Sequence, residues 1–547
     1  MNLGRRRYRV LTRTLYTIVH FSPVQAVRMS LLFATEDFST FGQILLLCLL
    51  ICVFLSGKAI WEHSFSKLPP GPWGLPLIGS CFRLGKNPHL DFTKMAQKYG
   101  DVFSLMLGNR LVVVLNGFNA IEEALIKQST AFAGRPQLHT FKLANRTDSS
   151  ITFTDYSPRW RLSRKIGVSA IQNFVKDKDT LGQKLLQESQ RLVHCLKQQK
   201  GKPVDVHLPL QCATSNIITD ALFGVSWSYS NKAVHNMLQL ADNFRVAITG
   251  CSHVDFLPLL KHLPSKALSD LTAAVKSVLD VISQLYAKNT ETYVGGQVRN
   301  IADSIINVVE KETEKERENR PQGEDTLSMA PLLSDEQIIR VLGDLFGAGF
   351  DTSAITLRWS LAYLTKYPEI QTQIQEELDL VIGRERLPTL QDMPSLPFFQ
   401  AAVYELFRVT SVAPLSVLRS TTVEANIRDF TIPKDTVVMV NLWSVHRDPE
   451  IWKDPDVFDP RRFLDGAGQV IDPKFFRGFM PFSCGRRKCP GDVLATKQVS
   501  VLLAALLHSF RFTQDGLPAD YKGINLQGEF GLTLVPQKFY VKIEERN

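Results

Sequence analysis

A cysteine in the segment FSCGRRKCPG, residues 482–491, is the strongest candidate for chemistry in this chain. Cys489 precedes Pro490, a residue that helices favour at their first position, and an apolar run of helical character follows. This predicts that Cys489 lies at or next to a helix N-terminus, where free backbone N–H groups and the helix dipole favour a thiolate. Gly485 and Gly491 allow a tight turn and close approach of a flat ligand. The alternative is an ordinary buried cysteine.

A second candidate lies in a long helix. Ser334-x-x-Gln337 has the capping-box pattern, and apolar positions continue at helical spacing until Pro368, which predicts a helix of about thirty residues through the whole molecule. Inside it lies FGAGFDT, residues 346–352, where each interior glycine costs about 1 kcal/mol relative to alanine. The glycines indicate either close helix packing or a place where a ligand approaches the backbone beside an acid and an alcohol.

The surrounding elements are predicted from periodicity. Two apolar runs flank Gly108-Asn109 between residues 103 and 115 and indicate a hairpin in a small sheet. Residues 160–310 are mostly helical in pattern, with an interruption at 250–264. The charged stretch 311–325 is typical of a solvated loop or helix end. We therefore expect a mainly α fold with small β-sheets.

Composition limits the functional classes. With 547 residues, 44% hydrophobic and 21% charged, the chain is a large globular protein that should divide into lobes. Eight cysteines without CxxC pairs suit a reducing compartment. Residues 1–40 carry +4 of the net charge of +9, and no basic run interleaved with aromatics occurs in the body, so nucleic-acid binding is not expected. A basic docking face for an acidic protein fits the charge equally well.

The N-terminal region predicts membrane attachment. Residues 1–40 form a basic extension, and residues 41–61 are apolar enough to make a transmembrane anchor. Retention of this anchor is favoured over a cleaved signal, because no small-x-small cleavage site follows. Residues 62–80 include KLPPGPWGLPLIG and predict a stiff, proline-rich stalk before a catalytic body at 81–547. The Arg-rich, acid-free start also leaves open a mitochondrial address.

The cysteine segment resembles the ligand loop of the cytochrome P-450 superfamily, the haem-thiolate monooxygenases. That loop reads Phe-x-x-Gly-x-Arg-x-Cys-x-Gly, and the five fixed places are filled here by Phe482, Gly485, Arg487, Cys489 and Gly491. The resemblance extends over about residues 67–540. It implies the cytochrome P-450 fold, with the long central helix over the haem.

Further motifs follow in the order that the family has. Glu405-x-x-Arg408 alone is a common helix pair, but with FDPRRF at 458–463 it resembles the family's Glu-Arg-Arg network, with Arg462 as the third member. Arg461 stands where the family often has an acid, which leaves its pairing open.

The resemblance also implies contacts to the haem propionates. An arginine suits this task, because its planar and permanently charged fork binds carboxylates with two hydrogen bonds. The implied contacts are Trp160 and Arg164, one helical turn apart, with Arg419 in PLSVLRSTT and Arg487 in the cysteine loop.

Haem b with Cys489 as thiolate ligand is the implied cofactor, and a thiolate ligand favours cleavage of the O–O bond. The family's acid–alcohol proton relay is matched by Asp351 and Thr352. No GxGxxG unit or Fe–S pattern is present, so electrons must come from another protein. For a membrane-anchored body the resemblance implies NADPH–cytochrome P-450 reductase as electron donor, with cytochrome b5 as a second candidate. It also implies a cytosolic catalytic domain on the endoplasmic reticulum membrane.

Within the superfamily, FGAGFDT, LGKNPHL at 84–90 and VDFLPLLKHLP at 254–264 are similar to vertebrate family one, the aryl-hydrocarbon-hydroxylase branch. This implies a narrow aromatic pocket for planar aromatic or steroid- or retinoid-like lipophilic substrates, in which rings stack on phenylalanines. The implied lining residues are Phe153, Phe244, Ala348, Gly349 and Ala413.

Two other activities remain open at this point. A thiolate-haem isomerase or dehydratase acting on peroxides needs neither a reductase nor a relay, and a haem carrier or sensor has no turnover. The presence of Asp351 and Thr352 argues against both.

Overall fold

The protein is described here by a computed structural model that covers residues 67–546 apart from 76, 146–148, 200–201, 251, 319–332, 519–520 and 522, together with the isolated positions 42, 47 and 50. The predicted basic extension 1–40, most of the predicted anchor 41–61 and residues 62–66 of the predicted stalk lie outside this range. Within the described part of the chain, no helix has both the length and the apolar character needed to cross a bilayer.

The described body is mainly helical, as predicted, and short 3-10 segments join several of the helices. The α-helices are α4 (Pro88–Tyr99), α5 (Gly117–Glu122), α6 (His139–Ala144), α7 (Pro158–Lys176), α8 (Lys178–Lys197), α9 (His207–Phe223), α10 (Lys232–Gly250), α11 (Ser252–Phe256), α12 (Lys266–Glu291), α13 (Ile301–Glu318), α14 (Asp335–Lys366), α15 (Pro368–Ile382), α16 (Pro397–Thr410), α17 (Leu442–His446) and α18 (Asp492–Ser509).

The strands of the described residues form three small sheets. Their bounds are β1 (Val102–Leu107), β2 (Arg110–Leu115), β3 (Arg419–Ser420), β4 (Ala425–Ile427), β5 (Phe430–Ile432), β6 (Val437–Val440), β7 (Phe510–Thr513) and β8 (Lys542–Glu545). The largest has the order β1-β2-β6-β3, in which β2 and β6 run parallel and the other neighbours antiparallel. β4 pairs with β5, and β7 pairs with β8.

The predicted hairpin is present, with Leu107 opposite Arg110. Gly108 in its turn has φ +56°, which favours glycine, and a Cβ there would lie 1.8 Å from the carbonyl oxygen of Phe256 in α11. The hairpin turn is thus pressed against the segment between α10 and α12. That segment is where the helical pattern was expected to be interrupted, and it folds as the short helix α11 and a 3-10 turn, Pro258–His262.

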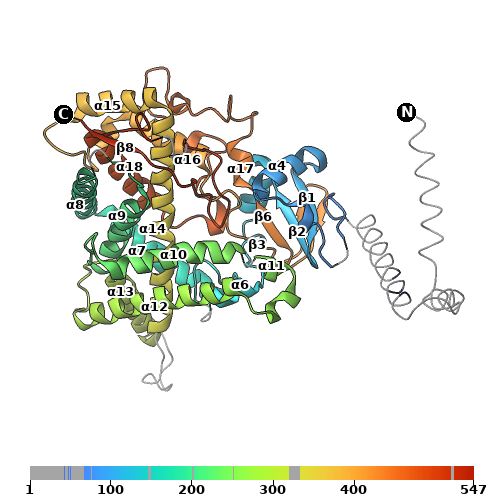
Figure 1. Cartoon of the computed structure of the whole chain (residues 1–547). Coiled ribbons are helices and arrows are strands. Elements are labelled where there is room, and N and C mark those ends of the chain that lie inside the picture. Colours follow the sequence, from blue (N-terminus) through green and yellow to red (C-terminus); the bar gives the residue numbers. More distant parts are fainter. Residues whose placement is uncertain are drawn as a thin grey trace, which may run out of the picture.

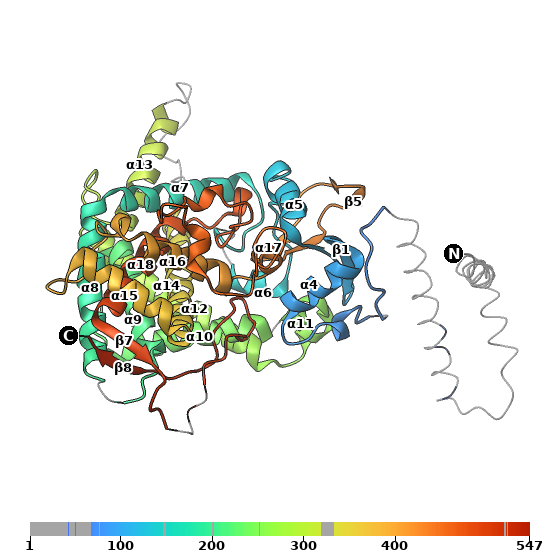
Figure 2. The same cartoon turned by 90° about the horizontal axis from the view of Figure 1, so that it is seen from above.

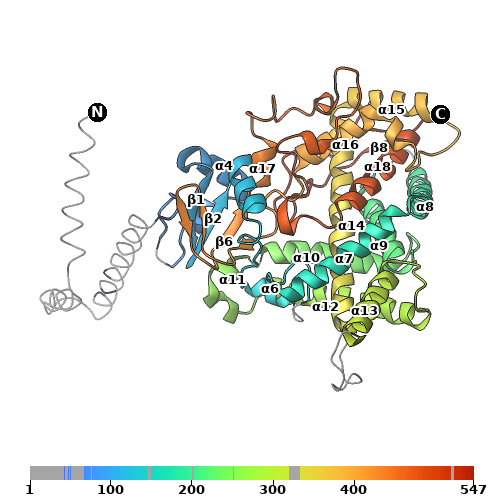
Figure 3. The same cartoon turned by 180° about the vertical axis from the view of Figure 1, so that it is seen from behind.

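The central helix α14 begins and ends close to the predicted residues. Ser334 and Gln337 form a reciprocal capping box, and the helix continues for 32 residues until Tyr367 caps it before Pro368. Figure 1 shows α14 running through the helical part, with the four-stranded sheet at one side. Seen from above, α15 and the β7–β8 sheet lie on the side away from the four-stranded sheet (Figure 2). From behind, α7 crosses α14 (Figure 3).

Separate hydrophobic cores support the helical part and the sheet. The largest core joins α14 to the surrounding helices and includes the fully buried Phe346, Leu357 and Leu361 of α14. Smaller cores lie on the two faces of the sheet, where neighbours in β2 alternate: Val113 faces one core and Val114 the other. The hydrophobic interior of the described body is therefore divided between the helical part and the sheet.

Residues 67–80 of the predicted stalk lie in extended or turn conformation along the sheet, apart from the undescribed position 76. The backbone N–H of Ser104 donates to the carbonyl oxygen of Pro70 at 2.8 Å, and the N–H of Thr431 donates to that of Lys67 at 2.8 Å. This part of the stalk is therefore tied to the catalytic body.

Candidate active site

The cysteine loop is a tight turn fixed from both sides. The N–H of Cys489 donates to the carbonyl oxygen of Phe482 at 3.0 Å. Gly485 has φ +72°, and a Cβ there would lie 1.9 Å from the carbonyl oxygen of Leu125. The ring of Phe482 packs 5.2 Å from that of Phe407 in α16. Gly485 therefore permits the predicted turn, and it also allows the loop to approach the backbone of Leu125 closely.

The sequence prediction for the start of the following helix needs correction. α18 begins at Asp492 with Gly491 as N-cap, so Pro490 precedes the helix and is not its first residue. Cys489 is consequently three residues before the helix. A backbone hydrogen bond from Gly491 lowers the pKa of the thiol, but burial raises it more, and the net shift is upward. A cationic partner for the sulfur, such as a metal ion, would reverse that balance because metals bind the thiolate.

Cys489 is surrounded by protein and nevertheless keeps an exposed surface. Both observations hold when the sulfur faces open space inside the molecule. The middle of α14 has the same character: Gly347 and Ala348 are exposed, although the helix around them is largely buried. Apart from the chain neighbours and the adjoining backbone of α14 itself, no atom of the described residues lies within 4 Å of a Cβ built at Gly347 or at Gly491.

The two glycines of the FGAGFDT segment in α14 have different surroundings, and the packing explanation is confirmed for Gly349. A Cβ at Gly349 would lie 2.8 Å from the Cδ1 atom of Ile218, so Gly349 is needed for close packing of α14 on α9. Gly347 instead faces space. Ala348 is exposed beside it, and its carbonyl oxygen accepts the hydroxyl of Thr352 at 2.8 Å. α14 remains helical through both glycines.

The Glu-Arg-Arg network predicted by resemblance is assembled. Glu405 and Arg408 of α16 are fully buried, and the guanidinium donates two hydrogen bonds of 2.7 Å to the carboxylate. Arg462 donates to the same carboxylate at 3.2 Å, and so does the N–H of Asp459 at 3.1 Å. Arg408 also donates to the carbonyl oxygen of His446 at 2.6 Å. One carboxylate thus fixes α16 to the segment that leads to the cysteine loop.

Arg461, whose pairing was left open, forms no part of this buried network. Its side chain is 67% exposed and lies 3.4 Å from the carboxylate of Asp459. Its contribution is therefore that of a surface ion pair.

Four arginines gather beside the cysteine loop: Arg135, Arg164, Arg419 and Arg487. Three of them were predicted to contact propionates. Arg135, in the segment FAGRP, was missed, because its one local signal is a charge within a mostly apolar run. Arg487 lies 3.8 Å from the ring centre of Trp160, and Arg164 lies 5.6 Å from it.

Backbone carbonyls hold most of these side chains in place. Arg487 donates to the carbonyl oxygens of Ala133, Ile151 and Thr154 at 2.8–3.2 Å. Trp160 donates its indole N–H to Ile151 at 2.9 Å, so this donor is already engaged within the protein. Arg164 donates to the carbonyl oxygen of Lys488, next to the cysteine.

Asp155 favours the charged forms of Arg135 and Arg487, but none of the four guanidinium groups forms an ion pair with a carboxylate among the described residues. Burial, with a smaller contribution from neighbouring arginines, lowers the pKa of Arg419 to about 10 and that of Arg487 to about 9. The Nε and Nη1 atoms of Arg419 have no hydrogen-bond partner in the described structure. Because guanidinium groups stay protonated in proteins, these shifts indicate a site that needs negative charge. Two carboxylates of a haem fit this need, and a thiolate at Cys489 fits its iron.

Asp351 and Thr352 are neighbours on α14 but have different partners. The carboxylate of Asp351 faces α10, where its Oδ2 atom lies 3.8 Å from the Nε atom of Arg245. Burial raises the pKa of Asp351 to about 6, and Arg245 is the largest influence that opposes this rise. The approach of Arg245 was not predicted, because no local pattern links α10 to α14.

The residues implied as the substrate lining are partly brought together. Phe153 and Phe244 pack in one cluster around Ala247, Ile248 and Leu271. Ala348 and Gly349 lie on α14, as described above. Ala413 is half-buried in the loop after α16 and accepts a backbone hydrogen bond from Ser416.

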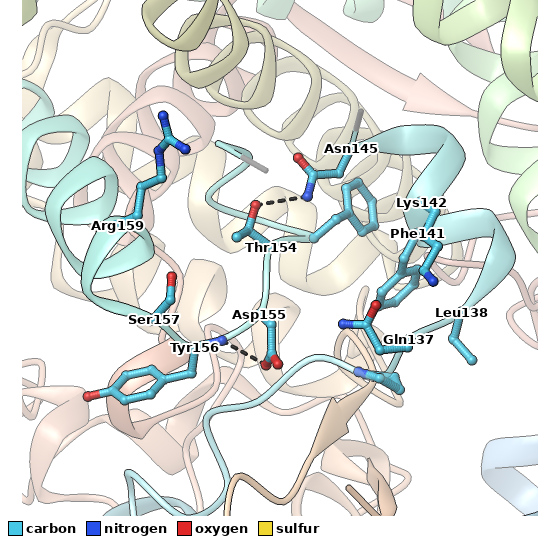
Figure 4. Close-up of a pocket in the computed structure, with 12 residues that line it drawn as sticks. Gln137, Leu138, Phe141, Lys142, Asn145, Thr154, Asp155, Tyr156, Ser157 and Arg159 are labelled. Atoms are coloured by element: carbon cyan, nitrogen blue, oxygen red, sulfur yellow. Dashed lines mark hydrogen bonds between the residues drawn. The ribbon is translucent and has the colours of Figure 1, made fainter. Parts of the chain in front are cut away.

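A half-open pocket of about 430 Å³ lies between α6 and the start of α7 (Figure 4). Its lining is mixed in polarity, with Phe141 and Phe153 together with Lys142 and Arg159. Its floor includes Thr154, whose hydroxyl accepts from the Asn145 amide at 2.9 Å and whose carbonyl oxygen holds Arg487. The pocket therefore adjoins the arginine cluster from outside.

Comparison with known proteins agrees with this geometry. The family model "Cytochrome P450" matches residues 69–543. Cytochrome P450 1A1 of Rattus norvegicus is 35% identical over 87% of this chain and 89% of its own length. Cytochrome P450 1A2 of the same organism is 34% identical, covering 94% and 97%, and cytochrome P450 1A1 of Sparus aurata is 32% identical, covering 92% and 95%. The chain therefore belongs to the cytochrome P450 family, the haem-thiolate monooxygenases.

Proposed function

We propose that this monooxygenase inserts one oxygen atom from dioxygen into a lipophilic substrate, with haem b bound to Cys489 and with electrons from an NADPH-dependent reductase. The observation that carries the proposal is the arginine cluster beside the cysteine loop. Arg419 has two unpartnered donor atoms among the described residues, and the cluster contains three further guanidinium groups. A dianionic, flat cofactor supplies the missing negative charge.

Two groups of residues would hold different parts of the proposed haem. Arg135, Arg164, Arg419 and Arg487 would bind its propionates, and Cys489 would hold its iron. Bound in this way, haem iron with a thiolate ligand supplies activation of dioxygen. The network of Glu405, Arg408 and Arg462 keeps the loop in position. Their common effect is to fix the cofactor before substrate arrives.

The chain's own residues on α14 manage space and protons. Gly347 and Ala348 leave room beside the helix for small molecules, because neither carries a large side chain. Thr352 holds its hydroxyl against the carbonyl oxygen of Ala348. Asp351, whose pKa of about 6 lies near neutrality, exchanges protons at physiological pH.

The substrate is proposed to be a planar aromatic or a steroid- or retinoid-like compound. This follows from the similarity to the cytochrome P450 1A1 and 1A2 proteins and from the cluster that contains Phe153 and Phe244. Stacking on a phenylalanine contributes about 0.5–1.5 kcal/mol beyond the burial of area. Ala348 and Ala413 would then leave a narrow slot, whereas Gly349, also implied as lining, packs against Ile218 of α9.

Electrons are proposed to enter at the outer face of the cysteine loop, from NADPH–cytochrome P-450 reductase or cytochrome b5. Arg486 and Lys488 are exposed there, and Arg477 is exposed close by in sequence. Positive side chains of this kind attract an acidic protein partner and speed its association.

Attachment to the endoplasmic reticulum membrane is proposed through the apolar segment 41–61. Five apolar side chains shortly after it are 39–75% exposed: Trp73, Leu75, Leu77, Ile78 and Phe82. An exposed apolar group of this size marks a contact surface, and its place next to the proposed anchor favours lipid as the partner. The mitochondrial membrane is the alternative location.

The test is turnover by purified, haem-loaded protein with reductase and NADPH, on a panel of planar aromatics, steroids, retinoids and fatty acids. Product that requires both NADPH and dioxygen supports the proposal. Rearrangement of peroxides without NADPH would identify an isomerase or dehydratase, and haem binding without any product would identify a carrier. Thr352→Ala should keep haem but waste NADPH, and unchanged coupling would contradict the relay.

A further inference from the structure

We propose that Arg245 of α10 is a positioning residue for proton delivery, because it sets the protonation of Asp351 from a neighbouring helix. The inference rests on the proposed function, since it concerns the relay acid of that reaction. It assigns to α10 a role in acid–base control that does not depend on contact with the substrate.

The geometry places Arg245 between two carboxylates. Its Nη2 atom donates to Asp242 Oδ1 at 2.9 Å, one turn earlier on α10, and its Nε atom lies 3.8 Å from Asp351 Oδ2 on α14. The side chains of all three residues are 15–17% exposed. Figure 1 shows α10 crossing α14. One guanidinium therefore serves two largely buried acids on different helices.

The pair with Asp351 is incompletely satisfied. Arg245 Nε and Asp351 Oδ1 are buried and have no hydrogen-bond partner among the described residues. Asp242, in contrast, accepts from His207 at 2.9 Å and from Gln211 at 3.2 Å, in addition to Arg245. Asp242 thus accepts hydrogen bonds from three side chains, whereas Arg245 lies 3.8 Å from Asp351 without a hydrogen bond.

The other charged groups around Asp351 come from three places. His207 faces it from α9, Arg358 from α14 itself, and Asp242 from α10. Asp205 precedes α9 and pairs with Lys538 at 3.5 Å at the outer edge of the cluster. Among these groups, Arg245 favours the ionised form of Asp351 most and Asp242 opposes it most.

This balance matters because a relay acid must alternate between two states. Each proton that Asp351 passes toward Thr352 has to be replaced by one from water, so the carboxyl group must both lose and regain a proton near neutral pH. Burial alone would hold Asp351 protonated. The guanidinium of Arg245 brings its titration back into the working range.

The test measures the protonation of Asp351 in haem-loaded protein by infrared titration, with Asp351→Asn as the reference that identifies its protonated C=O band. Arg245→Met should raise the midpoint by about 1 pH unit, because an opposite charge within 4–6 Å shifts a pKa by roughly 1–3 units and this pair is not hydrogen bonded. In Arg245→Lys the midpoint should return most of the way to that of the unsubstituted protein, because the positive charge is kept. Asp242→Asn should move the midpoint downward, since a competing anion is lost.

A merely structural role does not produce opposite shifts in the two variants. The matched control is Arg191→Met on α8, which breaks an arginine–carboxylate pair of 3.2 Å with Glu188 and should leave the midpoint unchanged. The ratio of product to NADPH consumed, measured against pH, should shift in the same directions as the infrared midpoints.

An unchanged midpoint in Arg245→Met, or an upward shift in Asp242→Asn, would overturn the inference. If Arg245→Met does not fold, the sign of the shift in Asp242→Asn decides. The infrared midpoints do not require turnover, so a protein that makes no product would contradict the proposed function while this measurement still gives its own answer.

Discussion

Replacement of Glu405 by glutamine should destabilise the protein strongly, although the two side chains are almost the same size. The carboxylate lies 2.7 Å from Arg408 and 3.2 Å from Arg462, and both Glu405 and Arg408 are fully buried. At an effective dielectric constant of about 20, one such contact has a gross Coulomb energy of about 6 kcal/mol. Desolvation offsets part of it, and removal of one partner from a buried pair typically costs about 3–5 kcal/mol.

The chain offers a matched control for this change. Glu312 and Lys315 form an ion pair of the same i,i+3 spacing on α13, but their side chains are 44% and 64% exposed. Glu312→Gln should change the free energy of unfolding by less than about 0.5 kcal/mol. The assay is urea unfolding of both variants, followed by circular dichroism. If Glu405→Gln unfolds within about 1 kcal/mol of the unsubstituted protein, the reasoning about the buried network is wrong.

Three further predictions concern the cysteine loop and the central helix. Gly485→Ala should prevent stable haem incorporation, because its Cβ would lie 1.9 Å from the carbonyl oxygen of Leu125 at a φ of +72°; normal pigment yield would contradict this. Gly349→Ala should lower the thermal unfolding midpoint because its Cβ would crowd Ile218, whereas Gly347→Ala should leave the midpoint unchanged. Equal midpoints in the two variants would contradict the conclusion that only Gly347 faces open space. Asp351→Asn should stabilise the protein above pH 6. Folding raises the pKa of Asp351 from 3.8 to about 6, so ionisation of this buried carboxyl group destabilises the folded state. This destabilisation is absent below pH 4 and reaches about 3 kcal/mol above pH 6. Urea unfolding at pH 4 and pH 8 checks this, and a difference that does not grow with pH would contradict it.

Local signals predicted the parts of the fold that depend on neighbours in sequence. The capping box at Ser334 and the stop at Pro368 defined α14, because both act within one helical turn. The turn at Gly108 was predicted for the same reason. The predicted start of α18 was wrong by two residues, because Pro490 suits a turn before a helix as well as a first helical position.

Contacts between distant segments could not be predicted from periodicity. Arg135 joins the cluster through carbonyl oxygens as far away as Val417 and Leu418, and Arg245 reaches Asp351 across about a hundred residues. Gly347 and Gly349 of α14 look alike in sequence, and only their surroundings separate a packing role at Gly349 from open space at Gly347. For the buried acids and bases, the direction of each pKa shift depends on burial by segments that are distant in sequence.

The most direct test of the account is the iron ligand itself. The visible spectrum of the reduced, carbon monoxide-bound protein should show a haem-thiolate centre, and Cys489→His should lose that signature while it still binds haem. A colourless purified protein, or a thiolate signature that survives in Cys489→His, would contradict the assignment of Cys489.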